Sequence, residues 1–342
     1  MSLFPKLTQQ DILAFQFSSW YHQFSRVSIK STIIRPLGED FIRYLSADGV
    51  FVPEGSEDIP AQSSLSDDDG DDEDDDSDPP ERYAFPELDA KIRIAIKEYG
   101  AVFPKLNFSS PKDASWVLPA GSPLKCTSPA DVYLLLKSSD FVQHDVNADS
   151  VFEGCDDSAA LDSPYSLELV LKKWYHIDTS REFRCFVRNN MLIGISQRDC
   201  NFYDFLNEQG TQKKMIQAIN LFWDSEVRQN WSSKDYTFDL LLTRDLSRAH
   251  IIDFNPWAPR TDPLLFTFEE LIDIDGNEAT LPIFKVIDSR AHPAATQNAP
   301  VHQHNMVPLE ALALGSGRDL EDFTRELHEE IKRTAVHDQG GK

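Results

Sequence analysis

The chain has 342 residues, 41% of them hydrophobic, which is enough for a proper core and suggests about two domains. Its 57 acidic and 33 basic residues give a formal net charge of −24, which argues against general binding to nucleic acid or to anionic membranes and favours a basic partner. The sequence has neither an apolar signal region nor a span of about 18 apolar residues, and its four cysteines show no CxxC spacing, so we expect a cytosolic or nuclear protein with reduced thiols and no zinc site.

The first predicted element is a helix near the N-terminus. Thr8 and Asp11 have the spacing of a capping box, and apolar residues follow at helical intervals. The stripe consists of Leu13, Phe17, Trp20, Tyr21 and Phe24. Stripes of this kind normally pack inward, but the aromatic richness also suits a partner surface, so both interpretations stay open. A short strand near residues 31–35 and a helix near 39–46 should follow.

An acidic run comes next. Residues 67–78 contain ten acidic side chains in twelve positions. Such a run cannot bury enough apolar surface to offset its ordering entropy, so we predict a disordered acidic loop over about residues 55–82. Its role is either solubility or docking to a basic surface.

A helix over residues 86–99, stopped by Gly100, and then a strand ending at Lys105 are predicted after the acidic loop. A lysine at a strand end can reach a phosphate as a flexible point charge. The stretch that follows contains Ser109, Ser110 and Lys112, and serine backbone amides can add donors to an anion-binding concavity. Ordinary surface lysines beside a serine–proline turn are the alternative.

The next part of the chain predicts a helix capped by Ser128, a loop over the polar stretch 142–162, and three strands. The strands are expected over 166–175, 181–187 and 191–198, the last two joined by the turn pair Asn189–Asn190. Side-chain alternation puts Glu182 and Arg184 on the polar face of the second strand. This face must meet solvent or a ligand, or its two side chains form an ion pair.

The segment 236–257, after a packing helix near 211–228, predicts a hairpin. Asp253 and Asn255 point the same way along one strand, and a turn near residues 245–247 brings Asp239 opposite Asp253. Like charges directly opposed on paired strands repel each other, and two carboxylates with an amide oxygen suit magnesium. The hairpin therefore predicts a metal site formed by Asp239, Asp253 and Asn255, with a solvated acidic face as the alternative.

The sequence from about residue 291 predicts a flexible tail that carries one amphipathic helix. Its apolar residues at helical spacing are Leu320, Phe323, Leu327 and Ile331. Such a helix is either a docked cap or a partner-binding element.

Taken in order, these features resemble the ATP-grasp superfamily, in which two lobes clamp ATP between antiparallel sheets and an acidic hairpin holds magnesium. The resemblance implies an α+β fold with an N-terminal lobe over residues 1–165, a C-terminal ATP-grasp lobe over 166–290 and a tail over 291–342. It implies phosphate contacts from Lys105 and the serine loop, adenine contacts from the backbone near Lys173, and a ribose contact from Glu182. The whole implied nucleotide site is Lys105, Ser109, Ser110, Lys112, Lys173, Trp174, Glu182, Arg184 and Arg198.

Two features depart from the superfamily. Position 253 carries aspartate where the ligases usually have glutamate, so the carboxylate reaches less far. The phosphate loop, which is glycine-rich in the superfamily, is here Asn-Phe-Ser-Ser-Pro-Lys over residues 107–112, which argues against rapid loop closure over a reacting phosphate.

A narrower resemblance is carried by short phrases at residues 103–116, 181–186 and 197–199, and at 252–257 together with 262–266. They are similar to the cell division cycle protein 123 family, also called D123, over most of the chain up to about residue 290. The resemblance implies a monomeric, cytoplasmic chaperone that binds ATP and magnesium and assists the assembly of translation initiation factor 2. It would bind the C-terminal region of the gamma subunit and promote its joining to the alpha subunit.

The alternative is an ATP-grasp ligase or kinase that acts on an unidentified substrate. The sequence favours it less, because no separate acceptor-binding domain with a glycine-rich turn and no recognisable His or Cys nucleophile motif is visible. No catalysed reaction can be assigned from the residues.

Overall fold

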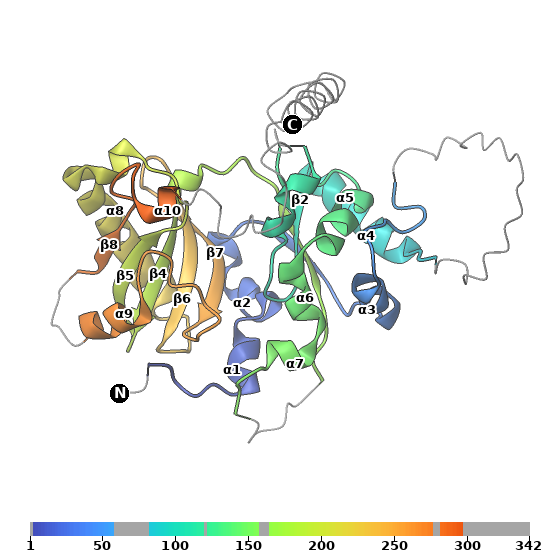
Figure 1. Ribbon diagram of the computed structural model, residues 1–342, viewed down its shortest axis with the longest axis horizontal. Helices are drawn as coiled ribbons and strands as arrows, with labels where there is room; N and C mark the ends of the chain where they lie inside the picture. The colour runs from blue at the N-terminus through green and yellow to red at the C-terminus, as the bar shows by residue number, and fades with distance from the viewer. Residues whose placement is uncertain (1–2, 58–81, 120–121, 157–163, 276–280, 297–342) are drawn as a thin grey trace, which may run out of the picture.

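Two β-sheets organise the chain, one in each half of the molecule (Figure 1). The computed structural model describes residues 3–57, 82–119, 122–156, 164–275 and 281–296. Helices pack against both sheets, so the mixed α+β character expected from the sequence is confirmed. The acidic run and the C-terminal amphipathic helix, which the sequence predicts, lie outside the described residues.

The first sheet has three strands in the order β1–β3–β2, and both strand pairs are antiparallel. The strands are β1 (Ser31–Ile34), β2 (Val102–Lys105) and β3 (Leu169–Lys173). Three helices surround an aromatic-rich core with this sheet, namely α3 (Glu39–Ser46), α4 (Pro86–Tyr99) and α5 (Pro129–Lys137). The predicted limits of α4 are confirmed, since Pro86 occupies its first turn and Gly100 follows its end with a positive φ angle.

The second sheet has five strands in the order β7–β6–β4–β5–β8, all antiparallel except for β8 beside β5. Its strands are β4 (Glu182–Arg188), β5 (Met191–Gln197), β6 (Tyr236–Leu242), β7 (Ala249–Pro256) and β8 (Ile283–Lys285). Asn189 and Asn190 form the predicted turn, with φ angles of 50° and 59° that asparagine tolerates. One face of the sheet shares a core with α8 (Gln209–Phe222) and the π-helical turn Trp223–Val227, and α9 (Phe268–Asp275) packs on part of the other face.

The aromatic stripe near the N-terminus is core. It lies on two short helices, α1 (Gln9–Ala14) and α2 (Phe17–Phe24), and the predicted capping box of Thr8 and Asp11 opens the first. Phe17, Trp20 and Phe24 are at most 2% exposed and belong to the core of the second sheet. Figure 1 shows α2 between the two sheets. The inward-packing interpretation of the stripe is therefore confirmed.

The two sheets do not divide the chain at residue 165. Strand β3 begins at Leu169, yet it is the central strand of the first sheet, and α2 lies early in the chain, yet it packs in the core of the second. The physical reason is that β3 supplies the hydrogen-bonding partner that β1 and β2 both lack, a pairing over more than sixty residues that no local pattern encodes.

The stretch 142–162 was expected to be a loop, and that expectation is wrong for its first part. The helices α6 (Asp140–Val146) and α7 (Ala148–Val151) lie there, and each begins at a side-chain cap, from Ser139 and Asn147 respectively. The polar composition of this stretch is typical of a loop, so the sequence pattern does not predict these two helices. The remaining short elements are 3₁₀ turns at Ser25–Val27, Lys112–Val117, Thr179–Arg181 and Asp204–Asn207, and the helix α10 (Pro293–Thr296).

The helices of the described residues are all too short or too polar to cross a membrane.

Replacing Trp20 with alanine should lower the free energy of unfolding by about 3–5 kcal/mol, because a large buried ring is lost from a close-packed core. Trp20 is 1% exposed, and its ring centroid lies 5.2 Å from that of Phe254 in β7. Denaturant unfolding measures the loss. His22→Ala on the exposed side of the same helix is the matched control and should change stability by less than about 0.5 kcal/mol. Equal effects of the two substitutions would contradict the placement of the stripe in the core.

Candidate functional site

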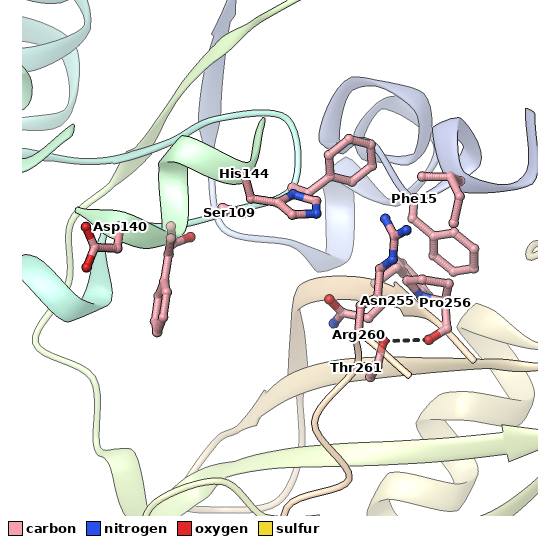
Figure 2. Close-up of a pocket in the computed structure, with 13 residues that line it drawn as sticks. Phe15, Ser109, Asp140, His144, Asn255, Pro256, Arg260 and Thr261 are labelled. Carbon is pink, nitrogen blue, oxygen red and sulfur yellow. Dashed lines mark hydrogen bonds between the residues drawn. The ribbon is translucent and has the colours of Figure 1, made fainter. Parts of the chain in front are cut away.

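A cleft between the two sheets contains three adjoining cavities. The first has a volume of about 220 Å³ and apolar walls, with residues 173–177 along one side. The second, also of about 220 Å³, is lined by several lysine and arginine side chains together with carboxylates. The third has a volume of about 370 Å³, and Ser110 and Asn255 line both it and the second cavity (Figure 2). Together the cavities have the size of a small-molecule site.

The predicted hairpin is formed by β6 and β7, and Asp239 pairs with Asp253 in its register as expected. A β-bulge follows this pair, because the register then passes to Leu240 opposite Ile251 and skips Ile252. Asp239, Asp253 and Asn255 all line the second cavity. The hairpin thus aims its three oxygen-bearing side chains into one space, beside a bulge of the kind often found next to functional sites.

Guanidinium groups already balance the charge of Asp239. Arg184 on the neighbouring strand β4 donates from Nε and Nη2 to its two carboxylate oxygens, at 2.8 and 2.9 Å, and Nε of Arg198 lies 3.3 Å away. Burial would raise the pKa of Asp239, but Arg184 and Arg198 outweigh burial and hold this pKa well below its usual range. The repulsion between opposed carboxylates is therefore relieved by the protein itself, so this repulsion alone does not require a metal.

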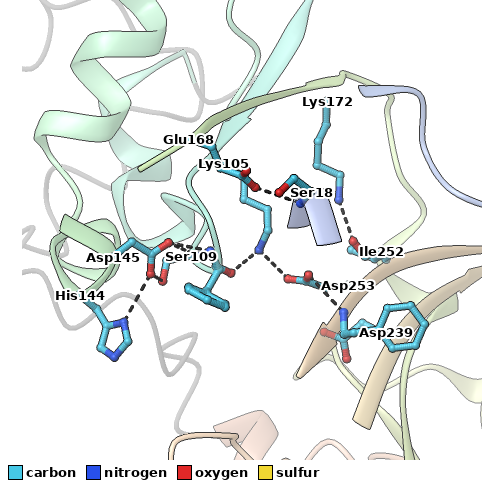
Figure 3. A network of polar contacts seen from close by, with 12 residues as sticks. Ser18, Lys105, Ser109, His144, Asp145, Glu168, Lys172, Asp239, Ile252 and Asp253 are labelled. Atoms are coloured by element: carbon cyan, nitrogen blue, oxygen red, sulfur yellow. Dashed lines mark hydrogen bonds and ion pairs between the residues drawn. The ribbon is translucent and has the colours of Figure 1, made fainter. Parts of the chain in front are cut away.

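Two lysines of the first sheet reach across the cleft to β7 (Figure 3). Nζ of Lys105 donates to Oδ2 of Asp253 at 2.7 Å and also to the carbonyl of Phe108. Nζ of Lys172 donates at 2.8 Å to the carbonyl of Ile252, the residue that the bulge leaves unpaired. These contacts connect the two halves of the molecule inside the candidate site.

Burial of the cleft lysines makes their charge responsive to a ligand. Burial lowers the pKa of Lys172 to about 7, and the neighbouring Lys105 and Lys112 lower it too, although Asp253 acts in the other direction. Burial also lowers the pKa of Lys112 to about 8, with a further contribution from Arg198. A bound anion would favour the charged form of both ammonium groups.

The donor set fits a hard divalent ion. Each carboxylate oxygen of Asp239 has a second lone pair beyond the one that Arg184 uses, and the side chain of Asn255 adds an amide oxygen at the same cavity. The described residues contain no group of three or more His, Cys, Asp or Glu side chains that could hold a metal. Two carboxylates and an amide are too few to enclose magnesium, which usually completes its shell with water and phosphate oxygens.

Part of the serine loop is already engaged within the protein. The backbone N–H groups of Phe108 and Ser109 both donate to Asp145 at 2.7 Å, and the Ser109 hydroxyl donates to the same carboxylate at 2.8 Å. The Ser109 amide, expected to be a phosphate donor, is thus engaged within the protein. Ser110 borders the second cavity, where the phosphate contact was expected.

The apolar cavity contains the residues expected to meet a base. Lys173, Trp174 and Glu182 line it, but the N–H groups of Lys173 and Trp174 already donate to Lys30 and Ala101. Glu182 is paired with Arg198 at 3.0 Å, so the ion-pair alternative for this strand face holds in part, with a different arginine from the one expected. The chain beyond Trp174 up to Ile177 also lines this cavity.

Most predicted site residues converge on the cleft, and three important ones were missed. Those that line a cavity are Ser109, Ser110, Lys112, Lys173, Trp174, Glu182, Arg184, Arg198, Asp239, Asp253 and Asn255, and Lys105 reaches the cleft through Asp253. The missed residues are Lys172, Asp145 and Arg260, whose guanidinium bonds the carbonyls of Val151 and Glu153. Lys172 had a usable signal, since it is a charged residue that directly follows the apolar run 169–171 in the same strand.

Known proteins resemble the chain over most of its length. A family model described as D123 matches residues 20–315. The translation initiation factor eIF2 assembly protein of Schizosaccharomyces pombe is 37% identical over 325 residues, which cover 93% of this chain and 95% of that protein. The protein of the same name from Xenopus tropicalis is 36% identical over 327 residues, which cover 92% and 94% of the two chains.

A solved structure shares the fold. The structure of Cdc123 from Schizosaccharomyces pombe superposes with a TM-score of 0.66 at 38% sequence identity, covering 83% of this chain and 100% of that chain. The mixed α+β fold with its two sheets is common to both. With sequence and structure in agreement over this length, the chain belongs to the D123 family.

Proposed function

We propose that the chain is an Mg-ATP-binding assembly factor for translation initiation factor 2, with an ATP-grasp arrangement in which the two sheets hold the nucleotide. The observation that most supports a bound nucleotide is the order of the cavities along the cleft. An apolar cavity suits a base, and the adjoining cavity offers ammonium and guanidinium groups for phosphates. Asp239, Asp253 and Asn255 border that second cavity and would hold magnesium against the phosphates.

The cleft contacts explain how ATP would act on the whole chain. Lys105 and Lys172 connect the first sheet to β7 directly in the structure. With Mg-ATP bound, the metal would engage Asp253 and a phosphate would engage Lys105, so the ligand would bridge the same two halves. A ligand that binds one arrangement of the two halves stabilises that arrangement, and with it any partner surface that both halves form.

The partner assignment rests on the family. Relatives carry the name translation initiation factor eIF2 assembly protein. The chain would act in the cytoplasm as a monomer, bind the C-terminal region of the gamma subunit and promote its joining to alpha. The net charge of −24 favours a basic partner surface.

Titration of the purified gamma subunit with the full chain, with and without Mg-ATP, tests the proposal. Tighter binding of gamma in Mg-ATP, followed by faster joining of alpha, is the expected result. Equal affinity under both conditions would remove the nucleotide from the assembly role. Consumption of ATP with a modified or phosphorylated product, detected by mass spectrometry, would instead favour the ligase or kinase alternative.

A further inference from the structure

A buried carboxylate holds the loop beside the second cavity, which is the cavity proposed to receive the phosphates. Asp145 lies on α6 with no exposed surface, and it accepts three hydrogen bonds from the segment that contains Phe108 and Ser109. Two of them come from successive backbone N–H groups and one from the Ser109 hydroxyl (Figure 3). Successive N–H groups that converge in this way form the kind of concavity that binds anions. In this protein the anion is a side chain of its own.

The other side of the same loop is also anchored. Asn107 is fully buried, and its side chain accepts from the N–H of Glu168 and donates to the carbonyl of Ser166, both at 2.9 Å. Its carbonyl accepts from the N–H of Phe17 at 3.0 Å. The loop is therefore tied to α6, to the start of β3 and to α2, so it is a fixed wall of the cleft and not a flap that closes over it.

We infer that Asp145 is a positioning residue of the nucleotide site, which holds the loop at 106–110 in place and occupies the N–H groups of Phe108 and Ser109, so that these two amides are not available to the phosphates. This inference rests on the proposed function, because it concerns how the same cleft receives ATP. The link to the phosphates is Lys105, whose Nζ donates to the carbonyl of Phe108 and so takes its position from the loop that Asp145 fixes.

Three substitutions separate the position of the loop from the charge of Asp145. Asp145→Asn keeps the acceptor for both backbone N–H groups, and the Ser109 hydroxyl can turn round to accept from the new amide. Asp145→Ala removes every bond to the loop. Asp145→Glu keeps the charge but displaces the carboxylate by one methylene. Asp89→Ala is the matched control, since Asp89 is a 2% exposed carboxylate that bonds Tyr133 elsewhere in the same half of the molecule.

Two measurements on the full chain are needed. In the ligand-free protein, amide hydrogen exchange at Phe108 and Ser109 should be slow in wild type and Asp145→Asn, and faster by about a hundredfold in Asp145→Ala. Calorimetry should show Mg-ATP affinity within about twofold of wild type for Asp145→Asn and Asp89→Ala, and about tenfold weaker for Asp145→Ala and Asp145→Glu, because binding must then order a loose loop.

The outcomes decide the inference in each case. Asp145→Asn as impaired as Asp145→Ala would show that charge and not position matters, and unchanged exchange in Asp145→Ala would show that the loop needs no anchor there; either result overturns the inference. If Asp145→Ala does not fold, the contrast between the Asn and Glu variants decides the same point. A wild-type protein that binds no Mg-ATP would refute the proposed function, while the exchange rates would still report whether Asp145 fixes the loop.

Discussion

Replacing Asp253 with asparagine should weaken Mg-dependent ATP binding by roughly a hundredfold, about 3 kcal/mol, and leave the fold intact. Magnesium prefers charged oxygen ligands, and the substitution removes one negative charge from a donor set that has only two carboxylates. The amide has the shape of the carboxylate, and its oxygen can still accept from Lys105. The side chain of Asp253 is 18% exposed, and the hydrogen bond to the buried Nζ of Lys105 is kept, so the lost charge should cost some stability without unfolding the protein.

The experiment is a calorimetric titration of ATP in magnesium and, separately, in a chelator. In the chelator, wild type and Asp253→Asn should bind ATP with similar, weak affinity. Asp245→Asn is the control, because this residue lies on the same hairpin, and its carboxylate bonds Thr243 and Ser247 in the turn, away from the cleft. Equal magnesium dependence in wild type and Asp253→Asn would exclude Asp253 as a metal ligand.

Asp239 is a less informative target than Asp253, although the sequence treats the two alike. Its carboxylate is 2% exposed and paired with Arg184 and Arg198, so Asp239→Ala would leave buried guanidinium groups without their counter-ion. Such a loss costs about 3–5 kcal/mol of stability. Lost ATP binding in that variant would therefore not distinguish a missing metal ligand from a disturbed fold.

The hairpin shows which part of the site can be predicted from sequence. The pairing of Asp239 with Asp253 follows from side-chain alternation and from turn residues that are close in the chain, and both are local. The capping box of Thr8 and the end of α4 at Gly100 are local signals too. Such elements can therefore be predicted from the sequence alone.

The partners of the two carboxylates could not be predicted in this way. Strand β4 lies beside β6 with Arg184 opposite Asp239, but α8 separates these strands in the chain, and no local pattern sets their order in the sheet. Opposed acids do require a cation, but Arg184 and Arg198, which supply it to Asp239, lie outside the hairpin. Asp145 was missed for a related reason, since its bonds to the loop near Ser109 join segments that are 36 residues apart.

Lys172→Met should weaken ATP binding and yet stabilise the ligand-free protein at acidic pH. The folded protein lowers the pKa of Lys172 from 10.5 to about 7, chiefly by burial. Between pH 7 and pH 10.5 the unfolded chain binds more protons than the folded one. The charge of Lys172 therefore lowers the free energy of unfolding by its full amount below about pH 7, and it has no effect above about pH 10.5. The full decrease in the free energy of unfolding is about 5 kcal/mol, since each unit of pKa difference corresponds to about 1.4 kcal/mol.

Methionine also loses the hydrogen bond to the carbonyl of Ile252, which costs about 1–3 kcal/mol at every pH. The variant should therefore be more stable than wild type at pH 6 and less stable at pH 10, as measured by denaturant unfolding of both proteins at each pH. Lys137→Met is the matched control. Lys137 is 8% exposed and donates to the carbonyls of Tyr44, Leu45 and Ala47. Burial lowers the pKa of Lys137 as well, so this control tests ATP binding, which Lys137→Met should not weaken.

The same lysine should make ATP binding take up protons. At pH 8 the side-chain amino group of Lys172 is mostly neutral in the ligand-free protein, and phosphates that enter the cleft favour its charged form. Calorimetry in buffers of different ionisation enthalpy should show proton uptake by wild type, decreased in Lys172→Met, with the remainder due to Lys112. Affinity should accordingly fall as the pH rises from 7 to 9. Undiminished uptake in Lys172→Met, or affinity that does not change with pH, would place the phosphates away from this lysine and therefore outside the second cavity.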